Sequence, residues 1–393
     1  MAALSVCIIG GGLAGSTAAH LLATAGEGVE VTVVDEDPDS PYDRPPLTKR
    51  LFQDQFDAAA QPAWAATKDL QWLHDRVLTI DPNGPTVHLE SGTVLMPDAV
   101  VMATGGRPRR QSSDMWGFAC IRTAADARWV RERVLSMPSA TAIIEGAGPL
   151  GCELATSLNL RGVPVTLVEA DRLPMRRLLG PEIGAEVATW AMEAGVDLRL
   201  ERHILAVDRS STGRYAIELS DGQRLDVSVA LSAIGMTPAS ELVAGWASAD
   251  SRGIHCDARG RVLAEDGAPY DTVYAIGDVA AVSHPVKGTL LHLESWTNAS
   301  EQGAAVAAEL LGRTPPILGR PYFWTEVFGR RVQVLGRVPM EATSRVLLAD
   351  YPEANGAVYR FDGDGVPAAW VAVNAPRDFA MIMRDERADQ ANK

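Results

Sequence analysis

Apolar and polar positions near the start of the chain follow the order strand, helix, strand. An apolar run at 6–9 precedes a glycine-rich turn, an alanine-rich segment at 16–25 with helical spacing, and a second apolar run at 29–34. Asp35 and Glu36 close this second run. This order predicts one βαβ unit with parallel strands.

The same pattern recurs in the middle of the chain. Apolar runs at 141–144 and 163–168 flank a second glycine-rich turn and a helical segment at 152–160. The two turns begin at Gly10 and Gly146, 136 residues apart (146 − 10). That separation is too long for a solenoid repeat and is about the length of one domain. The chain is therefore predicted to hold two domains of the same kind.

The last quarter of the chain has a different pattern. A helical segment near 298–311 is followed by a linker at 312–316 that is rich in Gly and Pro. From about residue 319 onward, apolar and polar residues alternate as in a small antiparallel sheet, and a helical segment ends the chain. The predicted fold class is therefore α/β, with two Rossmann-like dinucleotide-binding domains and a small α+β domain at the C-terminus.

The first turn has the spacing Gly-x-Gly-x-x-Gly in its required place between a strand and a helix. Gly10 permits the tight turn, Gly12 lets the backbone approach a pyrophosphate, and Gly15 lets the helix pack closely on the strand. An acid about 20 residues further on is expected to accept from a ribose hydroxyl. Asp35 lies 20 residues after Gly15 (35 − 15), and Glu36 is its neighbour.

The second turn repeats this spacing at Gly146, Gly148 and Gly151, and its acid is Glu169, 18 residues after Gly151 (169 − 151). A carboxylate at this place accepts from a ribose 2′-hydroxyl and repels a 2′-phosphate, which favours NADH over NADPH. Arginines that follow closely keep NADPH open as an alternative; they are Arg172, Arg176 and Arg177. Two such motifs suggest one nucleotide carried permanently and one exchanged.

Composition excludes several other classes. The 393 residues are 47% hydrophobic and 22% charged, as in globular proteins, and no apolar run approaches the ~18 residues of a membrane span. A net charge of −14 argues against nucleic-acid binding. The first residues lack the basic segment and the cleavage site of a signal peptide, which predicts a cytoplasmic protein. Four cysteines without a Cys-x-x-Cys pair indicate neither a metal site nor a redox-active dithiol.

Further motifs follow in order along nearly the whole chain: Ser40-Pro-Tyr-Asp-Arg-Pro-Pro-Leu-Thr-Lys49, Ala103-Thr-Gly-Gly-Arg-Pro108, Ile121-Arg-Thr123, Tyr274-Ala-Ile-Gly-Asp278, Leu293-Glu-Ser-Trp-Thr-Asn298 and Pro321-Tyr-Phe-Trp324. With them the chain resembles the FAD-dependent NAD(P)H:ferredoxin reductases. These are glutathione-reductase-like members of the pyridine nucleotide-disulfide oxidoreductase superfamily that lack the redox disulfide. The resemblance implies an FAD-binding domain at 1–111 and 240–316, an NAD(P)H-binding domain at 112–239 and a C-terminal domain at 317–393.

The resemblance also implies which residues contact the cofactors. Ala14 and Glu36 correspond to contacts with the adenosine half of FAD, and Arg44 to a contact with its ribose or pyrophosphate. Val77 is expected beside the adenine, and Asp278 beside the ribityl chain. The other implied cofactor positions are Ala103, Thr104, Gly105, Arg122, Gly235, Gly277, Glu294, Ser295, Trp296 and Trp324. Both tryptophans are expected beside the isoalloxazine ring.

Lys49 and Glu153 are the implied catalytic pair. Hydride arriving at flavin N5 leaves negative charge on the ring, and a cation beside it stabilises that form. Lys49 is expected to be this cation, and it is also expected to contact FAD. Glu153 corresponds to the acid that holds this lysine in place.

The implied function is that of an NADH-dependent ferredoxin reductase. It passes electrons from NADH through FAD to a [2Fe–2S] ferredoxin that supplies a P450 or a Rieske oxygenase, as a monomer or a homodimer. Three departures from the family pattern keep alternatives open: Glu145 replaces an apolar residue, Pro149 replaces an aromatic one, and Ala239 stands where Asn is common. The alternatives are a flavoenzyme of specialised metabolism that acts directly on a small molecule or oxygen, and a non-catalytic NADH-sensing protein.

Overall fold

The computed structural model describes residues 3–26, 28–60, 70–210, 213–284, 288–316, 319–340 and 344–391. The chain divides into two compact units with separate sheets and cores. The first unit consists of Met1–Asp43, Ala59–Arg107 and Met236–Leu318, and the second consists of Arg44–Ala58, Pro108–Gly235 and Gly319–Lys393. The second unit therefore includes the predicted NAD(P)H-binding and C-terminal segments together, and the three-domain division stays a prediction.

The first unit is built on one large sheet with a parallel centre. Its strands are, in spatial order, β22 (Leu290–His292), β21 (Ala280–Ser283), β18 (Gly253–Cys256), β19 (Arg261–Leu263), β20 (Pro269–Ala275), β7 (Ala99–Met102), β1 (Leu4–Ile9), β2 (Val29–Asp35) and β3 (Leu70–His74), with β17 (Ala249–Asp250) paired to β18. The strands from β20 to β3 all run parallel. Their carboxyl ends therefore meet at one edge, where α/β sheets bind ligands.

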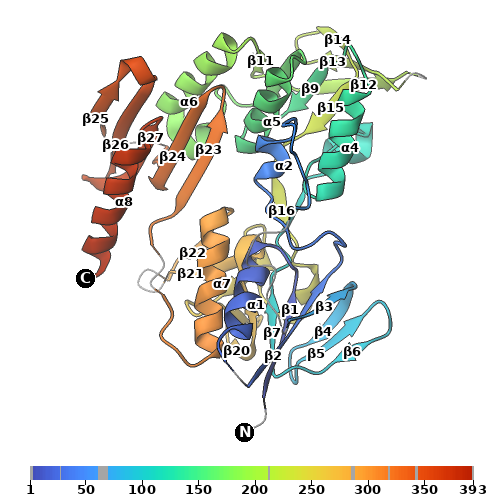
Figure 1. Ribbon diagram of the computed structural model, residues 1–393, viewed down its shortest axis with the longest axis vertical. Helices are drawn as coiled ribbons and strands as arrows, with labels where there is room; N and C mark the ends of the chain where they lie inside the picture. Colours follow the sequence, from blue (N-terminus) through green and yellow to red (C-terminus); the bar gives the residue numbers. More distant parts are fainter. Residues whose placement is uncertain are drawn as a thin grey trace. The chain divides into compact units, whose positions relative to one another are not determined.

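Helices α1 (Leu13–Ala23) and α7 (Trp296–Leu310) pack against each other beside this sheet (Figure 1). Alanines and glycines let the two helices approach closely, since a Cβ on Gly303 would collide with the backbone of α1. Helix α1 begins three residues before the predicted start at residue 16. The reason is that Gly12 is the N-cap and Gly15 already lies in the first helical turn.

Smaller elements complete the first unit. They are the antiparallel strands β4 (Val77–Asp81), β5 (Thr86–Leu89) and β6 (Val94–Leu95), the paired strands β8 (Gly106–Pro108) and β16 (Met236–Pro238), and the single 3-10 turns η2 (Glu241–Val243) and η3 (Gly277–Val279). The strands β4 and β5 contribute Val77, Ile80 and Val87 to the same core as the central strands.

The second unit repeats the βαβ plan. Its parallel sheet has the order β11 (Asp197–Leu200), β10 (Val165–Glu169), β9 (Ala142–Glu145) and β15 (Val229–Ser232). Its other elements are the helices α2 (Pro46–Lys49), α3 (Gln111–Trp116), α4 (Ala124–Leu135), α5 (Pro149–Leu160) and α6 (Arg176–Glu193), and the antiparallel strands β12 (Ile204–Arg209), β13 (Tyr215–Leu219) and β14 (Arg224–Val227). Thr123 and Asp126 form a capping box at the start of α4.

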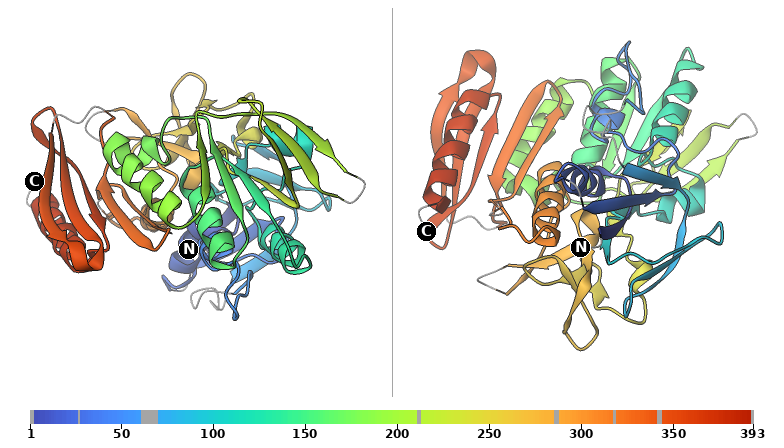
Figure 2. Two further views of the ribbon diagram at one scale, coloured as in Figure 1. Left: turned by 90° about the horizontal axis from the view of Figure 1, so that it is seen from above. Right: turned by 60° about the horizontal axis from the view of Figure 1, so that its bottom comes forward.

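The C-terminal part of the second unit is an antiparallel sheet. Its order is β23 (Tyr322–Val327), β24 (Arg330–Gly336), β27 (Val366–Val373), β26 (Gly356–Gly363) and β25 (Ser344–Tyr351), with the turn η4 (Pro352–Ala354) before β26. Figure 2 shows the terminal helix α8 (Pro376–Ala391) lying along one face of this sheet, where Phe379 packs on Trp370 and Val358. The predicted fold class is confirmed: two parallel βαβ units and a small α+β part.

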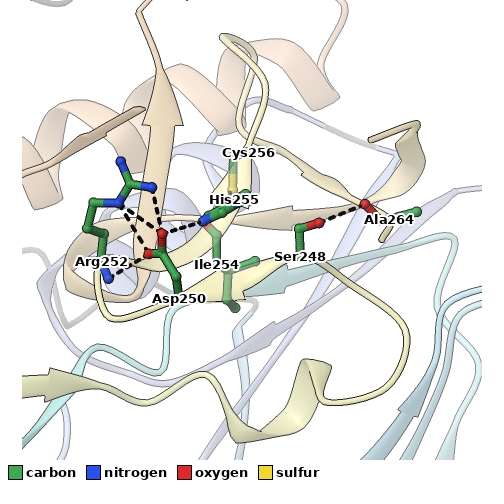
Figure 3. Close-up of polar contacts among 7 residues, drawn as sticks. All are labelled: Ser248, Asp250, Arg252, Ile254, His255, Cys256 and Ala264. Carbon is green, nitrogen blue, oxygen red and sulfur yellow. Dashed lines mark hydrogen bonds and ion pairs between the residues drawn. The ribbon is translucent and has the colours of Figure 1, made fainter. Parts of the chain in front are cut away.

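A polar cluster lies at the β17–β18 hairpin of the first unit (Figure 3). The Asp250 carboxylate accepts from the Arg252 backbone N–H at 2.8 Å and from its Nη2 at 2.6 Å, and His255 Nε2 lies 3.2 Å away. The Arg252 guanidinium, together with its backbone N–H and His255, holds the pKa of Asp250 well below its usual range despite partial desolvation. This ion cluster ties the turn of the hairpin to β18.

Candidate functional site

The first glycine loop, residues 10–15, joins β1 to α1. Gly10 has φ of 105°, and a Cβ there would collide with the carbonyl oxygen of Ala103. A Cβ on Gly15 would collide with the carbonyl oxygen of Gly10. Only glycine fits at both positions, so the loop turns tightly over the end of β1.

Asp35, the last residue of β2, holds the first glycine loop from the side. Its carboxylate accepts from the Gly11 N–H at 2.5 Å and from the Asp37 N–H at 2.9 Å. A carboxylate accepts about four hydrogen bonds, so acceptor capacity remains for a ribose hydroxyl. Glu36 is exposed and pairs with Arg76 at 2.7 Å. The contact between Asp35 and the loop was not predicted, because the sequence pattern assigns this acid only to the ligand.

The second glycine loop, residues 146–151, joins β9 to α5 in the second unit. Gly146 has φ of 97°, and a Cβ there would collide with the carbonyl group of Ala233. A Cβ on Gly151 would collide with the carbonyl oxygen of Gly146. These are the same close approaches as in the first glycine loop, so the repeat seen in the sequence is also a repeat of backbone geometry.

Glu169 holds the second glycine loop as Asp35 holds the first. Its carboxylate accepts from the Ala147 N–H at 2.6 Å and from the Asp171 N–H at 2.8 Å. Asp171 in turn pairs with Arg176 at 2.9 Å. One arginine that the sequence left as a possible partner for a 2′-phosphate is thus engaged within the protein.

Both loops fit the pyrophosphate of a dinucleotide. Helix α1 is capped by Gly12 and α5 by Gly148, and neither cap has a side chain to accept from the first-turn N–H groups. These donors and the helix dipole favour an anion. A Cβ on Gly148 would meet no protein atom within 4 Å. Packing within the protein therefore does not demand glycine at this position, whereas close approach of the loop backbone to a pyrophosphate would demand it.

Five of the other predicted FAD residues follow the carboxyl ends of β7 and β20: Ala103, Thr104, Gly105, Gly277 and Asp278. Val77 instead begins β4 and packs in the core. Ala103 follows β7, and the Thr104 hydroxyl donates to the Ala239 carbonyl at 2.8 Å. Gly277 follows β20, and a Cβ on it would lie 2.9 Å from the side chain of Ala14 on α1. Since β1, β7 and β20 are neighbouring parallel strands, Gly105 and Asp278 also lie at the edge that carries the first glycine loop.

The Glu294-Ser-Trp296 motif forms the start of α7. Ser295 is the N-cap, and its hydroxyl oxygen accepts from the Asn298 N–H at 3.3 Å. Trp296 is 40% exposed and donates from Nε1 to Asp43 at 3.3 Å. Glu294 is exposed. The motif thus has a capping role that is independent of any cofactor.

The predicted catalytic pair meets in the second unit. Lys49 ends α2, Glu153 lies on α5, and the Lys49 ammonium forms an ion pair with the buried Glu153 carboxylate. The same ammonium lies 5.9 Å from the ring centroid of Trp324 on β23. Two threonine hydroxyls also donate to this carboxylate, those of Thr48 and Thr325. These threonines were not predicted, because their only signal in the sequence is that they stand beside Lys49 and Trp324.

Three further predicted cofactor positions lie in the second unit: Arg44, Arg122 and Gly235. The Arg122 backbone N–H donates to Asp126 at the start of α4. Arg44 precedes α2 and is partly buried. Gly235 follows β15, is exposed, and has φ of 104°, which favours glycine.

Two residues that depart from the family pattern lie at the second glycine loop: Glu145 directly precedes it, and Pro149 is part of it. Glu145 ends β9 and accepts from the hydroxyl of Ser232, its register partner on β15, at 3.3 Å. Pro149 is the first residue of α5, where its fixed φ suits the helix start. Proline has no N–H, so α5 offers one donor fewer to an anion than α1, which has Leu13 at this place.

All four cysteines are free thiols. Burial raises the pKa of Cys7 to about 12 and raises those of Cys152 and Cys256 still further. Cys120 is partly buried, and burial also raises its pKa. These are the properties of inert structural thiols.

Within the ranges that the structure describes, no helix is long and apolar enough to cross a membrane.

Comparisons with known proteins agree with this geometry. The chain is 34% identical to the ferredoxin reductase component of chlorobenzene dioxygenase from Cupriavidus sp. (strain PS12), over 97% of this chain and 92% of the relative. It is 32% identical to the ferredoxin--NAD(+) reductase subunit of the benzene 1,2-dioxygenase system from Pseudomonas putida, over 96% and 91%. A solved ferredoxin reductase for the CYP199A2 system from Rhodopseudomonas palustris matches with a TM-score of 0.85 and 26% identity, over 94% and 91%.

The predicted resemblance is thereby confirmed. A family model described as pyridine nucleotide-disulphide oxidoreductase matches residues 4–303, which include both glycine loops, the acids that hold them and the start of α7. The chain therefore belongs to the pyridine nucleotide-disulphide oxidoreductase family and is an oxidoreductase that uses FAD and a pyridine nucleotide.

Proposed function

We propose that this protein is an NADH-dependent ferredoxin reductase, which passes electrons from NADH through FAD to a [2Fe–2S] ferredoxin serving a P450 or a Rieske oxygenase. The observation that carries the proposal is the pair of glycine loops, each held by an acid at the end of a neighbouring strand. The names of the relatives, which are reductase components of dioxygenase systems, support the choice of acceptor.

The division of the two nucleotides follows from the surroundings of each loop. The first glycine loop is proposed to hold FAD, because Ala103, Gly277 and Asp278 gather beside it. The second glycine loop is proposed to hold NADH. Glu169 supports NADH over NADPH, since a 2′-phosphate would face its carboxylate and Arg176 is engaged with Asp171.

Lys49 is proposed to act on the flavin as a fixed positive charge. When bound, FAD supplies the redox chemistry, because it takes two electrons from NADH and delivers them singly. Lys49 then stabilises the negative charge of the reduced ring, and the buried Glu153 carboxylate keeps the ammonium in position. The raised pKa values of Cys7, Cys152 and Cys256 argue against a disulfide reductase, whose thiols must ionise.

The arginines that we propose to meet a ferredoxin have glutamates nearby. Arg107 pairs with Glu241 at 3.2 Å, and Arg330 and Arg331 each lie 3.8 Å from a glutamate. These residues belong to the two arginine clusters of the sequence, 107–110 and 330–337. Steering is therefore proposed to depend on local patches, and the net charge of −14 opposes it.

The test combines three measurements on the purified FAD-loaded protein. FAD content is measured first, then the rate at which NADH bleaches the flavin in a stopped-flow instrument, and then NADH-driven reduction of several [2Fe–2S] ferredoxins. The expected result is fast bleaching with NADH, slower bleaching with NADPH, and catalytic reduction of at least one ferredoxin. Failure of NADH to bleach the flavin would overturn the proposal.

A second candidate is a flavoenzyme that acts directly on a small molecule or on oxygen. Pro149 and Glu145 favour it, because they remove one N–H donor and add one carboxylate near the second glycine loop. This candidate predicts poor reduction of every ferredoxin and a flavin spectrum that changes when the substrate is added. The same stopped-flow series distinguishes the two functions.

A further inference from the structure

The Glu153 carboxylate is a meeting point of three segments that lie far apart in the sequence. One oxygen, Oε1, accepts from the Lys49 ammonium and from the Thr325 hydroxyl at 2.6 Å. The other, Oε2, accepts from the Thr48 hydroxyl at 2.6 Å. Helix α2, helix α5 and strand β23 thus each supply part of one polar cluster in the second unit.

The cluster is closed to solvent. Thr325 is 0% exposed, Thr48 3% and Glu153 5%, whereas the Lys49 side chain keeps 15% exposure. A buried carboxylate is costly unless each oxygen has a donor, and an ionised carboxylate can accept from all three of these groups. Only the lysine reaches toward the outside, so the threonines act on the carboxylate and the ammonium is the part offered to a ligand.

Fixing the carboxylate is the way to fix the ammonium. Lysine is a point charge on a flexible stem with several rotatable bonds, so its position follows that of its partner. The hydroxyls of Thr48 and Thr325 hold both oxygens of Glu153 against rotation. The backbone of α2 is anchored too, because the Ser157 hydroxyl donates to the Thr48 carbonyl at 2.5 Å.

We propose that Thr325 and Thr48 are positioning residues that orient Glu153 and thereby hold the Lys49 ammonium where it stabilises reduced flavin. The proposal rests on the proposed function, since it assigns the flavin as the group that Lys49 serves. It adds a role for β23, which lies outside both βαβ units and which belongs to the C-terminal sheet.

A neighbouring contact provides a matched control. The Phe328 backbone N–H donates to the Thr156 hydroxyl at 3.0 Å, and this hydroxyl donates to the Cys152 carbonyl at 2.7 Å. Thr156 lies on α5, as Glu153 does, and Phe328 directly follows β23. The substitution Thr156→Val thus removes a partly buried hydroxyl that joins α5 to the end of β23, without touching Glu153.

The experiment compares Thr325→Val, Thr325→Ser, Thr48→Val and Thr156→Val in the FAD-loaded protein. The flavin midpoint potential is measured by dye-coupled reduction with dithionite, which needs no NADH, and the rate of reduction by NADH is measured separately. Thr325→Val and Thr48→Val are expected to move the potential to more negative values and to slow reduction by about fivefold to tenfold, the effect of one lost hydrogen bond. Thr325→Ser is expected to restore both values.

Thr156→Val is expected to lower thermal stability while leaving the potential unchanged. A wild-type potential in both Thr325→Val and Thr48→Val, with FAD bound, would overturn the proposal. Equal shifts in Thr325→Val and Thr156→Val would also overturn it, because they would show a merely structural effect. If wild-type flavin is not reduced by NADH but the potential still shifts in Thr325→Val, the proposed function fails and the positioning role stands.

Discussion

Glu145 distinguishes the second glycine loop from the first at the scale of single residues. Glu145 is the last residue of β9, beside the proposed NADH site, and its carboxylate accepts a hydrogen bond from the Ser232 hydroxyl. We predict that Glu145→Gln lowers the KM for NADH by roughly threefold to tenfold, because it removes a repulsive charge and keeps an acceptor for Ser232. The measurement is a steady-state NADH titration with an artificial electron acceptor. Glu132→Gln, an exposed charge on α4, is the control, and an unchanged KM in Glu145→Gln would contradict the prediction.

Asp250 gives a prediction about pH. Arg252 holds the pKa of Asp250 in the folded chain below its value in the unfolded chain. The ionised carboxylate therefore stabilises the fold at any pH above the pKa that Asp250 has in the unfolded chain. This stabilisation is lost as the pH falls toward the lower pKa of the folded chain. Asp250→Asn is therefore expected to lower the melting temperature at pH 7, and the difference from wild type should shrink progressively below about pH 4. Thermal unfolding at a series of pH values measures this, and a difference that stays constant down to pH ~3 would contradict it.

Contacts of single residues also show which parts of the site could be predicted from the sequence and which could not. The pair Lys49 and Glu153 was predicted from the family resemblance, and the structure brings the two side chains together. Thr325 was missed, because a hydroxyl that serves a buried carboxylate has no spacing rule. Its partner lies 172 residues away in the sequence, so only the folded chain reveals the contact.

The two glycine loops give a prediction at the scale of elements. Gly151→Ala places a methyl group against the Gly146 carbonyl and is expected to destabilise the fold. Gly148→Ala meets no protein atom within 4 Å and is expected to fold normally but to bind NADH more weakly. Thermal melting and NADH titration separate the two effects. Normal NADH affinity in Gly148→Ala would show that no nucleotide approaches this loop.

Element boundaries were predicted less well than element order. The order of strands and helices in both βαβ units follows from periodicity, yet α1 and α5 each begin three residues earlier than predicted, at Leu13 and Pro149. From the sequence pattern, the third glycine of each motif was assigned to the turn. In the structure it belongs to the helix, since a glycine in the first turn permits the close approach to the strand.

For the whole molecule, removal of FAD is expected to lower stability. FAD is proposed to bind the first glycine loop and the ends of β7 and β20, all of which belong to the folded first unit. At a free FAD concentration about 100 times its Kd, binding adds about 2.7 kcal/mol to the free energy of unfolding. Melting curves of the FAD-free and reconstituted chains measure the change, and identical curves would contradict the assignment of the site.

The fold class of the whole chain was accessible from sequence because the glycine spacing and the strand-end acids recur at a fixed separation. The pairing of strands that lie far apart in the sequence could not be predicted in this way. The parallel contact of β7 with β20 joins residues near 100 to residues near 273, and no local pattern specifies such a partner. The sequence likewise does not divide the chain into the two compact units, because that division depends on packing between segments such as α2 and α5.

Because Asp35 and Glu169 make the same contacts with their glycine loops, free ADP is expected to compete with the nucleotides that bind there. Asp35 and Glu169 shape their loops alike, so each loop is expected to recognise the adenosine diphosphate half of its ligand. ADP alone should then bind twice to the FAD-free chain and once to the FAD-loaded chain, as calorimetric titration can count. A single ADP in both states would contradict this. With FAD in place, a rising ADP pool would slow NADH oxidation by occupying the second loop, without a separate regulatory site.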